Sequence, residues 1–384
     1  MSKRILHIAF EEPNKVSGGG LAVYQTGLSL LRNYDVDYLG KSFDGLDELT
    51  YSDKVFLEAS GSFSSRIRSL LAMSTTTIYD AFIKSAKEVD WSGYDCVVID
   101  ATRYLFAVKY AKRYELPVFI RVFNAEVDYL NAKFGANKTL IQEYVCMAAK
   151  RAETLVCDLA DGFIFLTQND KSRFFELYGR CSGRDSIIPI CLEEKLKRSD
   201  KKYECEKVSL LATGSLWLKP NQDGILWFIC EVLPVIRESY PLVSMTVAGS
   251  HPSRTFIDRC SKSGVRVAES PDENEMDRLF LSSDIYVAPI LDGAGMKVKV
   301  AEALSRGLPV AATPHALIGY HGIQGFLCVA SGVSSLEFAN SVCKLVDNLK
   351  NPLLQPHEIQ NLFNEHYSME ASAIRFREVI DGLV

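Results

Sequence analysis

The sequence predicts an α/β protein made of two consecutive domains, each built on a doubly wound parallel sheet. Its 384 residues exceed what one ordinary hydrophobic core needs. Short apolar runs alternate with segments of helical spacing along nearly the whole chain, as in parallel α/β sheets. The alternation stops once, at the highly charged stretch 192–207, and then restarts.

The first half begins with a buried strand at residues 5–10 and a glycine loop, Gly18 to Gly20. Further strands are expected where short apolar runs recur, at 96–99, 116–123, 162–167 and 187–190. Helical spacing predicts helices at 21–33, 105–115, 140–160 and 169–179. Gly179 suits the end of the last of these helices.

The second half repeats the pattern, with strands expected at 209–214, 243–249, 284–290 and 308–313. Helices are expected at 225–238, 272–283, 297–307 and 371–383. The domains are therefore predicted at 1–191 and 208–369, joined by a linker at 192–207, with the helix at about 370–384 packing back on the first domain. Ligands bind beyond the carboxyl ends of parallel strands, so we expect function in a cleft between two facing domains.

Composition excludes several classes of protein. A net charge of −5 argues against a dedicated nucleic-acid binder. Ten cysteines without a CxxC pair favour reduced thiols in a cytoplasmic protein, and the six histidines form no spaced metal set. No stretch of 18 apolar residues occurs, so any contact with the inner face of the cell membrane is expected to be peripheral. The absence of G-x-S-x-G, G-x-G-x-x-G and G-x-x-x-x-G-K-[ST] argues against a nucleophile-elbow hydrolase, a dinucleotide dehydrogenase and a P-loop kinase.

The most informative stretch is APILDGAGMKVKVAEALSRGLPVAATP, residues 288–314. A strand is followed by a glycine loop and then by a helix that starts near Met296. Glycines let the backbone approach a ligand, and a helix N-terminus with lysines favours phosphate. Lys299 and Glu302 share a helix face, so one can meet a diphosphate while the other accepts hydrogen bonds from ribose. The alternative is a solvated i,i+3 ion pair beside ordinary turn glycines.

This stretch resembles the donor-site signature of group 1, family 4 glycosyltransferases of the GT-B fold, with a GxG loop, a K-x-x-E-A helix and a following G-x-P-V-x-x-T. The segments ATGSLWLKPNQDG, SGGGLAVYQ, RVFNAEVDYL and ADGFIFLTQNDKSRF are also similar to that family. The likeness runs from about residue 5 to 345, and it is stronger in the second half. It implies two Rossmann-like domains that face a central cleft.

In the second half, the resemblance implies that Glu302 holds the ribose of the sugar nucleotide, with Lys299 and Lys297 facing the diphosphate. Backbone amides of the loop would contact the sugar or the phosphates, and Asp292 lies near the family's sugar-contacting carboxylate. Its spacing to Glu302 is ten rather than eight, which departs from the family's pattern. The donor-binding residues expected here are Gly214, Ser215, Lys219, Gly293, Gly295, Lys297, Lys299 and Glu302. Ser215 replaces a family arginine, for which Lys219 compensates only loosely.

In the first half, Gly18, Gly19 and Gly20 are expected to line the cleft; the alternative is a turn that merely starts a helix. Asn124 and Glu126 follow a strand and would meet the acceptor or the transferred sugar, or else hold their own loop. Asp100 also follows a strand, and it would meet the acceptor hydroxyl or cap a helix, as Thr102 could. Asp100, Asn124, Glu126 and Asp292 are thus the catalytic candidates.

The resemblance implies a glycosyltransferase that moves a sugar from a nucleoside-diphosphate sugar to a glycan or lipid-linked glycan, with retention, in bacterial surface-polysaccharide assembly. It implies no cofactor and no metal besides the donor substrate. Two alternatives stay open: a sugar-nucleotide epimerase of the same fold, and a non-catalytic partner subunit of a transferase. The departures at Ser215, Phe123 and Asp292 motivate the second alternative.

Overall fold

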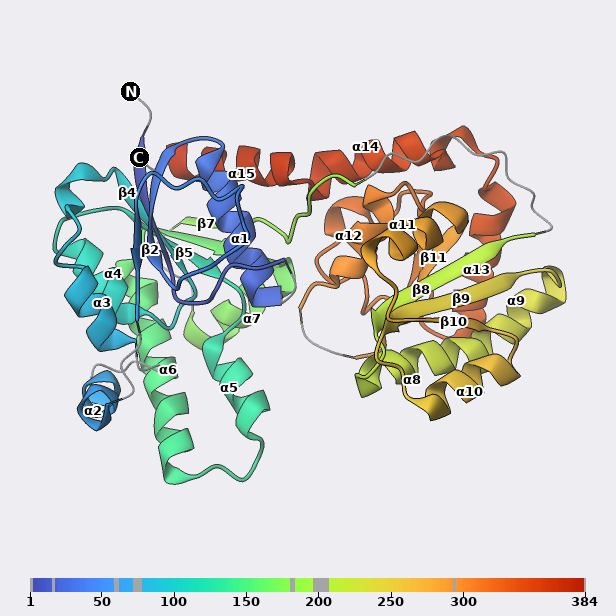
Figure 1. The fold of residues 1–384 in the computed structure, drawn as a ribbon, viewed down its shortest axis with the longest axis horizontal. Helices are drawn as coiled ribbons and strands as arrows, with labels where there is room; N and C mark the ends of the chain where they lie inside the picture. Colours follow the sequence, from blue (N-terminus) through green and yellow to red (C-terminus); the bar gives the residue numbers. More distant parts are fainter. Residues whose placement is uncertain are drawn as a thin grey trace. The chain divides into compact units, whose positions relative to one another are not determined.

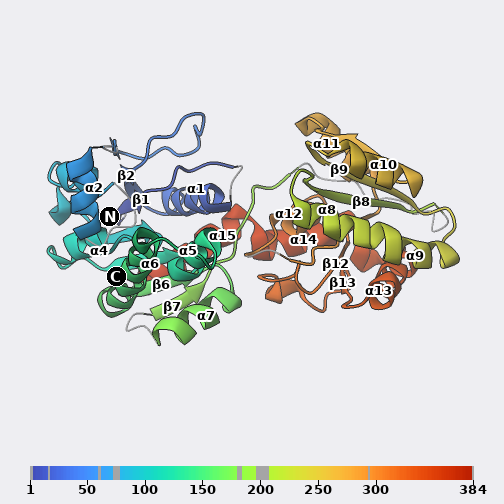
Figure 2. The ribbon, with the colours of Figure 1, turned by 90° about the horizontal axis from the view of Figure 1, so that it is seen from below.

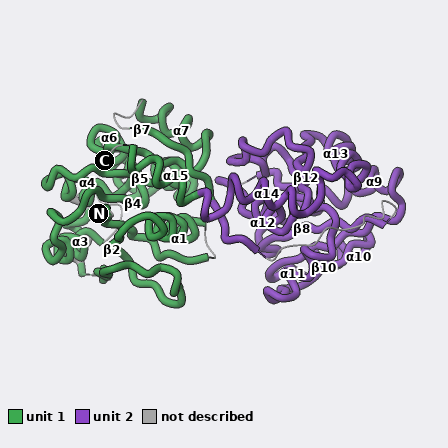
Figure 3. The backbone as a smooth tube through the Cα atoms, turned by 90° about the horizontal axis from the view of Figure 1, so that it is seen from above, with its two compact units in different colours: residues 1–190, 372–384 green, residues 191–371 purple. Residues whose placement is uncertain are grey.

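The computed structural model describes residues 3–15, 18–58, 62–71, 78–179, 184–195, 207–292 and 295–382. The chain divides into two compact units, shown in Figure 3: residues 1–190 with 372–384, and residues 191–371. Most of the expected linker, residues 196–206, lies outside the described residues, and so does Gly293.

The first unit is built on a seven-stranded sheet with the order β3-β2-β1-β4-β5-β6-β7, in which every described pair of strands is parallel (Figure 1). Its strands are β1 (Arg4–Ala9), β2 (Asp35–Gly40), β3 (Lys54–Phe56), β4 (Cys96–Asp100), β5 (Val118–Val122), β6 (Gly162–Phe165) and β7 (Arg184–Ile187). Its helices are α1 (Gly18–Leu31), α2 (Phe63–Leu71), α3 (Tyr79–Ser85), the 3-10 turn η1 (Trp91–Gly93), α4 (Leu105–Lys112), α5 (Glu126–Phe134), α6 (Leu140–Leu159) and α7 (Gln168–Tyr178).

Helices cover both faces of this sheet, as Figure 2 shows. On one face, α3, α4 and α6 pack against alternate strand residues such as Ile8, Ile99 and Ile120. The other face carries α1 and the chain's last helix, α15 (Met369–Asp381), which are joined by a 2.8 Å hydrogen bond from Gln25 Nε2 to Ser372 Oγ. Because α1 is buried from Gly20 to Leu30, its polar side chains must bond within the protein.

The second unit has a six-stranded sheet with the order β10-β9-β8-β11-β12-β13, again parallel in every described pair. Its strands are β8 (Ser209–Ser215), β9 (Ser244–Ser250), β10 (Arg266–Glu269), β11 (Ile285–Ala288), β12 (Val310–Ala312) and β13 (Val329–Ser331). Its helices are α8 (Lys219–Trp227), the π-helical turn η2 (Phe228–Val232), α9 (Leu233–Ser239), α10 (Arg254–Lys262), α11 (Glu273–Ser282), α12 (Val298–Ser305), η3 (His321–Ile323), α13 (Ser335–Asn348), η4 (Pro352–Leu354) and α14 (Pro356–Tyr367).

The predicted α/β class and parallel sheets are confirmed, and two local predictions are wrong. A strand was expected at 187–190, but the strand β7 covers Arg184–Ile187 instead. The hydrogen bonds to β6 end with the Ile188 amide, because Pro189 has no N–H to continue them. The glycines expected in a loop, Gly18 to Gly20, instead form the first turn of α1.

Candidate functional site

A small cavity lies at the carboxyl ends of β8 and β11 in the second unit. Its lining includes Thr213, Asn221, Tyr286, Ile290 and Lys299. These residues meet because β8 and β11 are neighbouring parallel strands. The cavity therefore occupies the edge of the sheet at which parallel α/β proteins bind ligands.

Lys299 is the cation of this cavity. It is half-buried in the first turn of α12, and its Nζ donates to Asn221 Oδ1 at 3.1 Å. Burial lowers the pKa of Lys299 to about 8, although the nearby Glu302 carboxylate opposes the shift. Burial likewise lowers the pKa of Lys297, which Asp292 opposes. Two partly desolvated ammonium groups therefore lie at one helix N-terminus, where an anion would stabilise both.

Tyr320 anchors the start of α12. The Tyr320 hydroxyl accepts from the Ala301 amide at 3.0 Å and donates to the Lys297 carbonyl at 2.8 Å, which fixes the first turn. No side chain caps this helix. Among the described residues, the amides of Val298 and Lys299 have no acceptor. These amides and the two lysines form the combination that binds phosphate groups.

Glu302 follows Lys299 by three residues, so the two side chains share a face of α12. It is half-buried, and its carboxylate accepts no hydrogen bond from the described part of the chain. A carboxylate in this position can accept from paired hydroxyl groups. The face of α12 thus offers a cation for phosphate and an acceptor for a sugar hydroxyl.

The structure brings some of the other predicted donor residues to this cavity. A Cβ atom on Gly214 would lie 2.8 Å from Lys299 Nζ, so the glycine permits the close approach. Ser215 accepts through its carbonyl from Asn221 Nδ2 at 2.9 Å, which orients the amide that bonds Lys299. Gly295 adopts a φ of +72°, a conformation that favours glycine, in the loop before α12.

Lys219 and Asp292 are not among the residues that line this cavity. Lys219 is 83% exposed and pairs with Asp223, one helical turn further along α8. Asp292 is exposed in the loop after β11. Gly293 lies outside the described residues.

Sequence reasoning missed two residues that shape the cavity. Asn221 bonds both Lys299 and the end of β8, and its place in the Pro-Asn pair at the start of α8 is the signal that could have found it. Gly224 lets α8 pack against the end of β11, because a Cβ atom there would lie 2.0 Å from the Pro289 carbonyl oxygen.

In the first unit, the predicted residues gather at the carboxyl ends of β1, β4 and β5. Glu126 begins α5 and accepts from Arg103 Nη1 at 3.0 Å, and both side chains are largely buried. Gly18 is exposed, Gly19 lies against the Glu11 side chain and Gly20 against Asn14. Asn124 is exposed at the end of β5.

Asp100 requires a correction. Its carboxylate is 1% exposed and accepts from Thr26 Oγ1 at 3.1 Å, while its other oxygen lies 2.8 Å from His7 Nε2. In this structure its carboxylate is therefore engaged within the core of the first unit, and contact with an acceptor hydroxyl stays a prediction. The capping alternative is wrong, because α4 begins after Tyr104 without a side-chain cap. Ala101, the next residue, has a φ of +85°, a strained conformation of the kind found near functional edges.

Glu153 of α6 is a buried carboxylate that the sequence did not point to. It accepts from the hydroxyls of Thr102 and Tyr178 and from the amides of Glu126 and Val127. Burial raises its pKa, and these hydrogen bonds oppose that shift. Glu153 thereby fixes the start of α5, on which Glu126 lies.

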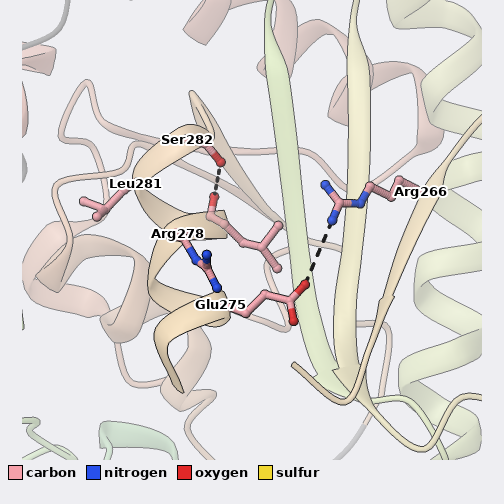
Figure 4. A pocket seen from close by; sticks show the side chains of 6 residues that line it. Arg266, Glu275, Arg278, Leu281 and Ser282 are labelled. Atoms are coloured by element: carbon pink, nitrogen blue, oxygen red, sulfur yellow. Dashed lines mark hydrogen bonds and ion pairs between the residues drawn. The ribbon is translucent and has the colours of Figure 1, made fainter. Parts of the chain in front are cut away.

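Two larger pockets lie at the opposite edges of the sheets. One, of about 600 Å³, lies between the first residue of β10 and the end of α11, where Figure 4 shows Arg266 directed at Glu275. The other, of about 220 Å³, is lined by Arg4, Asp37 and Tyr94 near the starts of β1, β2 and β4. Both are at amino ends of strands, where α/β sheets seldom bind ligands, so the smaller cavity at Lys299 is the better candidate.

Among the described residues, no group of three histidine, cysteine, aspartate or glutamate side chains could hold a metal ion. Within the same residues, no helix is both long and apolar enough to cross a bilayer.

Comparison with known proteins identifies the second unit. Residues 207–348 match the sequence profile of the family described as Glycosyl transferases group 1. The chain carries a group 1 glycosyltransferase domain. The matched segment holds the Lys299 cavity and all of α12. This match confirms the predicted family resemblance for residues 207–348.

The chain is also similar to a Klebsiella pneumoniae protein described as "Uncharacterized 44.6 kDa protein in cps region". The two are 22% identical over 204 residues, a match that spans 50% of each chain. The chain thus matches about half the length of this relative.

Solved structures resemble the whole chain. HepE from Anabaena in complex with UDP has a TM-score of 0.65 at 13% identity, covering 99% of this chain and 100% of that one. WaaG, a glycosyltransferase involved in lipopolysaccharide biosynthesis, has a TM-score of 0.58 at 16% identity, covering 96% and 99%. Sucrose-phosphate synthase from Thermosynechococcus elongatus has a TM-score of 0.61 at 15% identity, covering 99% of both chains. At these identities the similarity establishes the fold, which is the GT-B fold predicted from the sequence.

Proposed function

We propose that this protein transfers a sugar from a nucleoside-diphosphate sugar to a glycan or lipid-linked glycan acceptor, with retention, in the assembly of a bacterial surface polysaccharide. The observation that carries the proposal is the face of α12. There, the partly desolvated Lys299 ammonium, two amides without acceptors and the Glu302 carboxylate lie within one helical turn. This set matches a diphosphate followed by a ribose.

The proposed chemistry follows from that arrangement. The acceptor oxygen forms a bond to the sugar C1, the bond from C1 to the diphosphate oxygen breaks, and the acceptor proton leaves with the diphosphate. Negative charge develops on the leaving group, so the positive end of α12 with Lys299 and Lys297 would stabilise the transition state. These groups supply the positive charge, so the proposal includes no cofactor beyond the donor.

The similar proteins support the choice of substrate class. HepE has been solved in complex with UDP and with UDP-glucose, so uridine diphosphate is the first donor nucleotide to test. WaaG is involved in lipopolysaccharide biosynthesis, and the Klebsiella relative is described by its cps region. We propose a cytoplasmic location for the reaction, with acceptors presented at the inner face of the membrane.

A thermal-shift screen against UDP, GDP, ADP, TDP and CMP tests the proposal. A ligand at 100 times its dissociation constant adds about 2.7 kcal/mol to the free energy of unfolding, which raises the melting temperature measurably. We expect one nucleoside diphosphate to stabilise the wild type and to have little effect on Glu302→Ala. Equal stabilisation of both proteins would refute the site.

The same preparation separates the two alternatives. If an NMR time course with donor alone shows epimerisation of the sugar, the protein is an epimerase. If no nucleotide binds by calorimetry, it is a non-catalytic subunit. Transfer of the sugar only when acceptor is added supports the proposal.

A further inference from the structure

The pocket of about 220 Å³ near the starts of β1, β2 and β4 has no part in the proposed sugar transfer. Asp37 of β2 and Leu6 of β1 form its buried lining, and they are register partners on neighbouring parallel strands. Val55 of β3 and residues 88–90, which follow α3, complete its walls. All of these residues belong to the first unit, so the pocket is separate from the cavity at Lys299.

Asp37 places a carboxylate on a face of the sheet that is otherwise apolar. Leu6 beside it and Leu39, two residues further along β2, belong to the hydrophobic core on this face. The Asp37 side chain is 4% exposed, and its Oδ2 accepts from Arg4 Nη2 at 2.7 Å and from the Tyr94 hydroxyl at 2.8 Å. Its Oδ1 is also buried, and it accepts no hydrogen bond from the described residues. Because a buried carboxylate oxygen without a donor costs free energy, a donor on a ligand would stabilise Asp37.

The lining of this pocket is acidic. Asp53, Glu88 and Asp90 line it as well, and all three are exposed to solvent. Within the described residues, none of these three carboxylates takes part in an ion pair. Arg4 is the one cationic residue among the described lining residues, so four carboxylates and one guanidinium give a net charge of −3. Such a concentration of one sign of charge in a concave site attracts a cation.

The layout of these carboxylates favours an extended organic cation over a metal ion. No group of three carboxylates in the described part of the chain is arranged to hold a metal. Apolar side chains separate the charges, namely Leu6, Val55 and Val89. The volume corresponds to about seven water molecules at about 30 Å³ each, which is room for a short alkyl chain. A carbon chain with an ammonium group at each end therefore matches the lining, because its methylenes can pack on apolar residues while its charged ends meet carboxylates.

We propose that this pocket binds a short aliphatic diamine in its doubly charged form, with one ammonium group donating to Asp37 Oδ1 and the other meeting Asp53 and Glu88. The first ammonium group would complete the hydrogen bonding of the buried carboxylate with a charge-assisted bond. The bound diamine would also join β2 and β3 to the loop after α3, so it should stabilise the first unit. The proposal goes beyond sugar transfer and does not depend on the donor site.

Calorimetry of the full chain with putrescine, a four-carbon diamine, tests the proposal. We expect saturable binding of putrescine at low salt, and weaker binding at high salt, because the exposed carboxylates are then screened. Butylamine should bind about fivefold or more weakly, because it lacks the second ammonium group, and butanediol, which has no charge, should not bind.

Two variants remove carboxylates from the pocket. Asp53→Asn combined with Glu88→Gln should weaken putrescine binding about fivefold, because two exposed charges are lost. Asp37→Asn should weaken it about tenfold or more, because the buried acceptor loses its charge. Asp37→Asn also weakens the bonds to Arg4 and Tyr94, so urea denaturation must first show that this variant is folded. If it is not folded, the variant at Asp53 and Glu88 still decides.

Asp44→Asn combined with Asp47→Asn is the matched control, because it removes the same charge from exposed positions of the first unit that do not line the pocket. This control should bind putrescine as the wild type does. Absence of putrescine binding to the wild type, or an equal loss of affinity in the control and in the variant at Asp53 and Glu88, overturns the proposal. Displacement of putrescine by magnesium chloride at constant ionic strength also overturns it, in favour of an inorganic cation. Nucleotide binding, measured separately, should be unchanged in these variants and distinguishes these outcomes from failure of the donor site.

Discussion

The two units use charged residues at the ends of their strands in opposite ways. In the first unit, Asp100 and Glu126 are buried and bonded to partners within the same unit. In the second, Lys299 has one neutral hydrogen-bond partner, and Glu302 accepts no hydrogen bond from the described residues. Polar groups whose bonds are complete hold loops in place, whereas groups that lack them can be completed by a ligand. This difference supports the proposal that the donor nucleotide binds to the second unit.

The largest expected effect is on Lys299. Replacing it by methionine should weaken nucleoside-diphosphate binding about a hundredfold, close to 2.7 kcal/mol, because a desolvated cation facing the phosphates is lost. Lys219→Met is the matched control, since that side chain is exposed and paired with Asp223. Calorimetry measures the affinity of both variants for the nucleoside diphosphate. A similar loss of affinity in the two variants would contradict a specific role for Lys299.

The next largest effect is expected on stability when Asp100 is replaced. Asp100→Ala should lower the free energy of unfolding by about 2 kcal/mol or more, because buried polar groups of His7 and Thr26 lose their partner. Nucleotide affinity should stay within twofold of the wild type. Urea denaturation measures the first quantity and calorimetry the second. Lost affinity in a variant that remains folded would show that the first unit also contacts the nucleotide.

The fold was largely predictable from the sequence, because buried parallel strands leave continuous apolar runs. Strands such as β4 and β11 lie within one or two residues of their predicted bounds. The strand β2 was missed, since DVDYLG carries two aspartates, and Asp37 is buried only because Arg4 and Tyr94 donate to it. The π-helical turn at Phe228–Val232 was also missed, and it lies just before Pro234, whose missing N–H breaks the regular helix pattern.

The site was predictable where it is local in sequence. Lys299 and Glu302 share one helix, so their spacing alone placed them together. The partners of Asp100 are 93 and 74 residues away in the chain, and no periodicity reveals such contacts. Lys219 was expected to compensate loosely for the family arginine that Ser215 replaces, yet this first residue of α8 faces solvent.

The pH dependence of nucleoside-diphosphate binding tests the role of Lys299 in the second unit. The pKa of Lys299 is about 8 in the free protein, and a bound diphosphate should raise it, because the anion favours the charged form. Below pH 8 the Lys299 side chain is already protonated, so its titration does not change the affinity for the nucleoside diphosphate. Above pH 8, binding requires proton uptake, so affinity should fall up to about tenfold per pH unit. Calorimetry between pH 7 and 9 measures this slope, which Lys299→Met should lack.

The smallest effect is expected at Gly214. Gly214→Ala places a Cβ atom 2.8 Å from Lys299 Nζ, which a flexible side chain relieves by a small shift. We expect affinity to fall about three- to fivefold while the free energy of unfolding changes by less than about 1 kcal/mol. Unchanged affinity would indicate that Lys299 need not lie against β8 to bind the phosphates.

A crystal structure with the nucleoside diphosphate selected by thermal shift is the most direct test. We expect phosphate oxygens within about 3.2 Å of Lys299 Nζ and of the first amides of α12, with a ribose hydroxyl bonded to Glu302. A nucleotide bound elsewhere, with Lys299 still bonded to Asn221 alone, would contradict it.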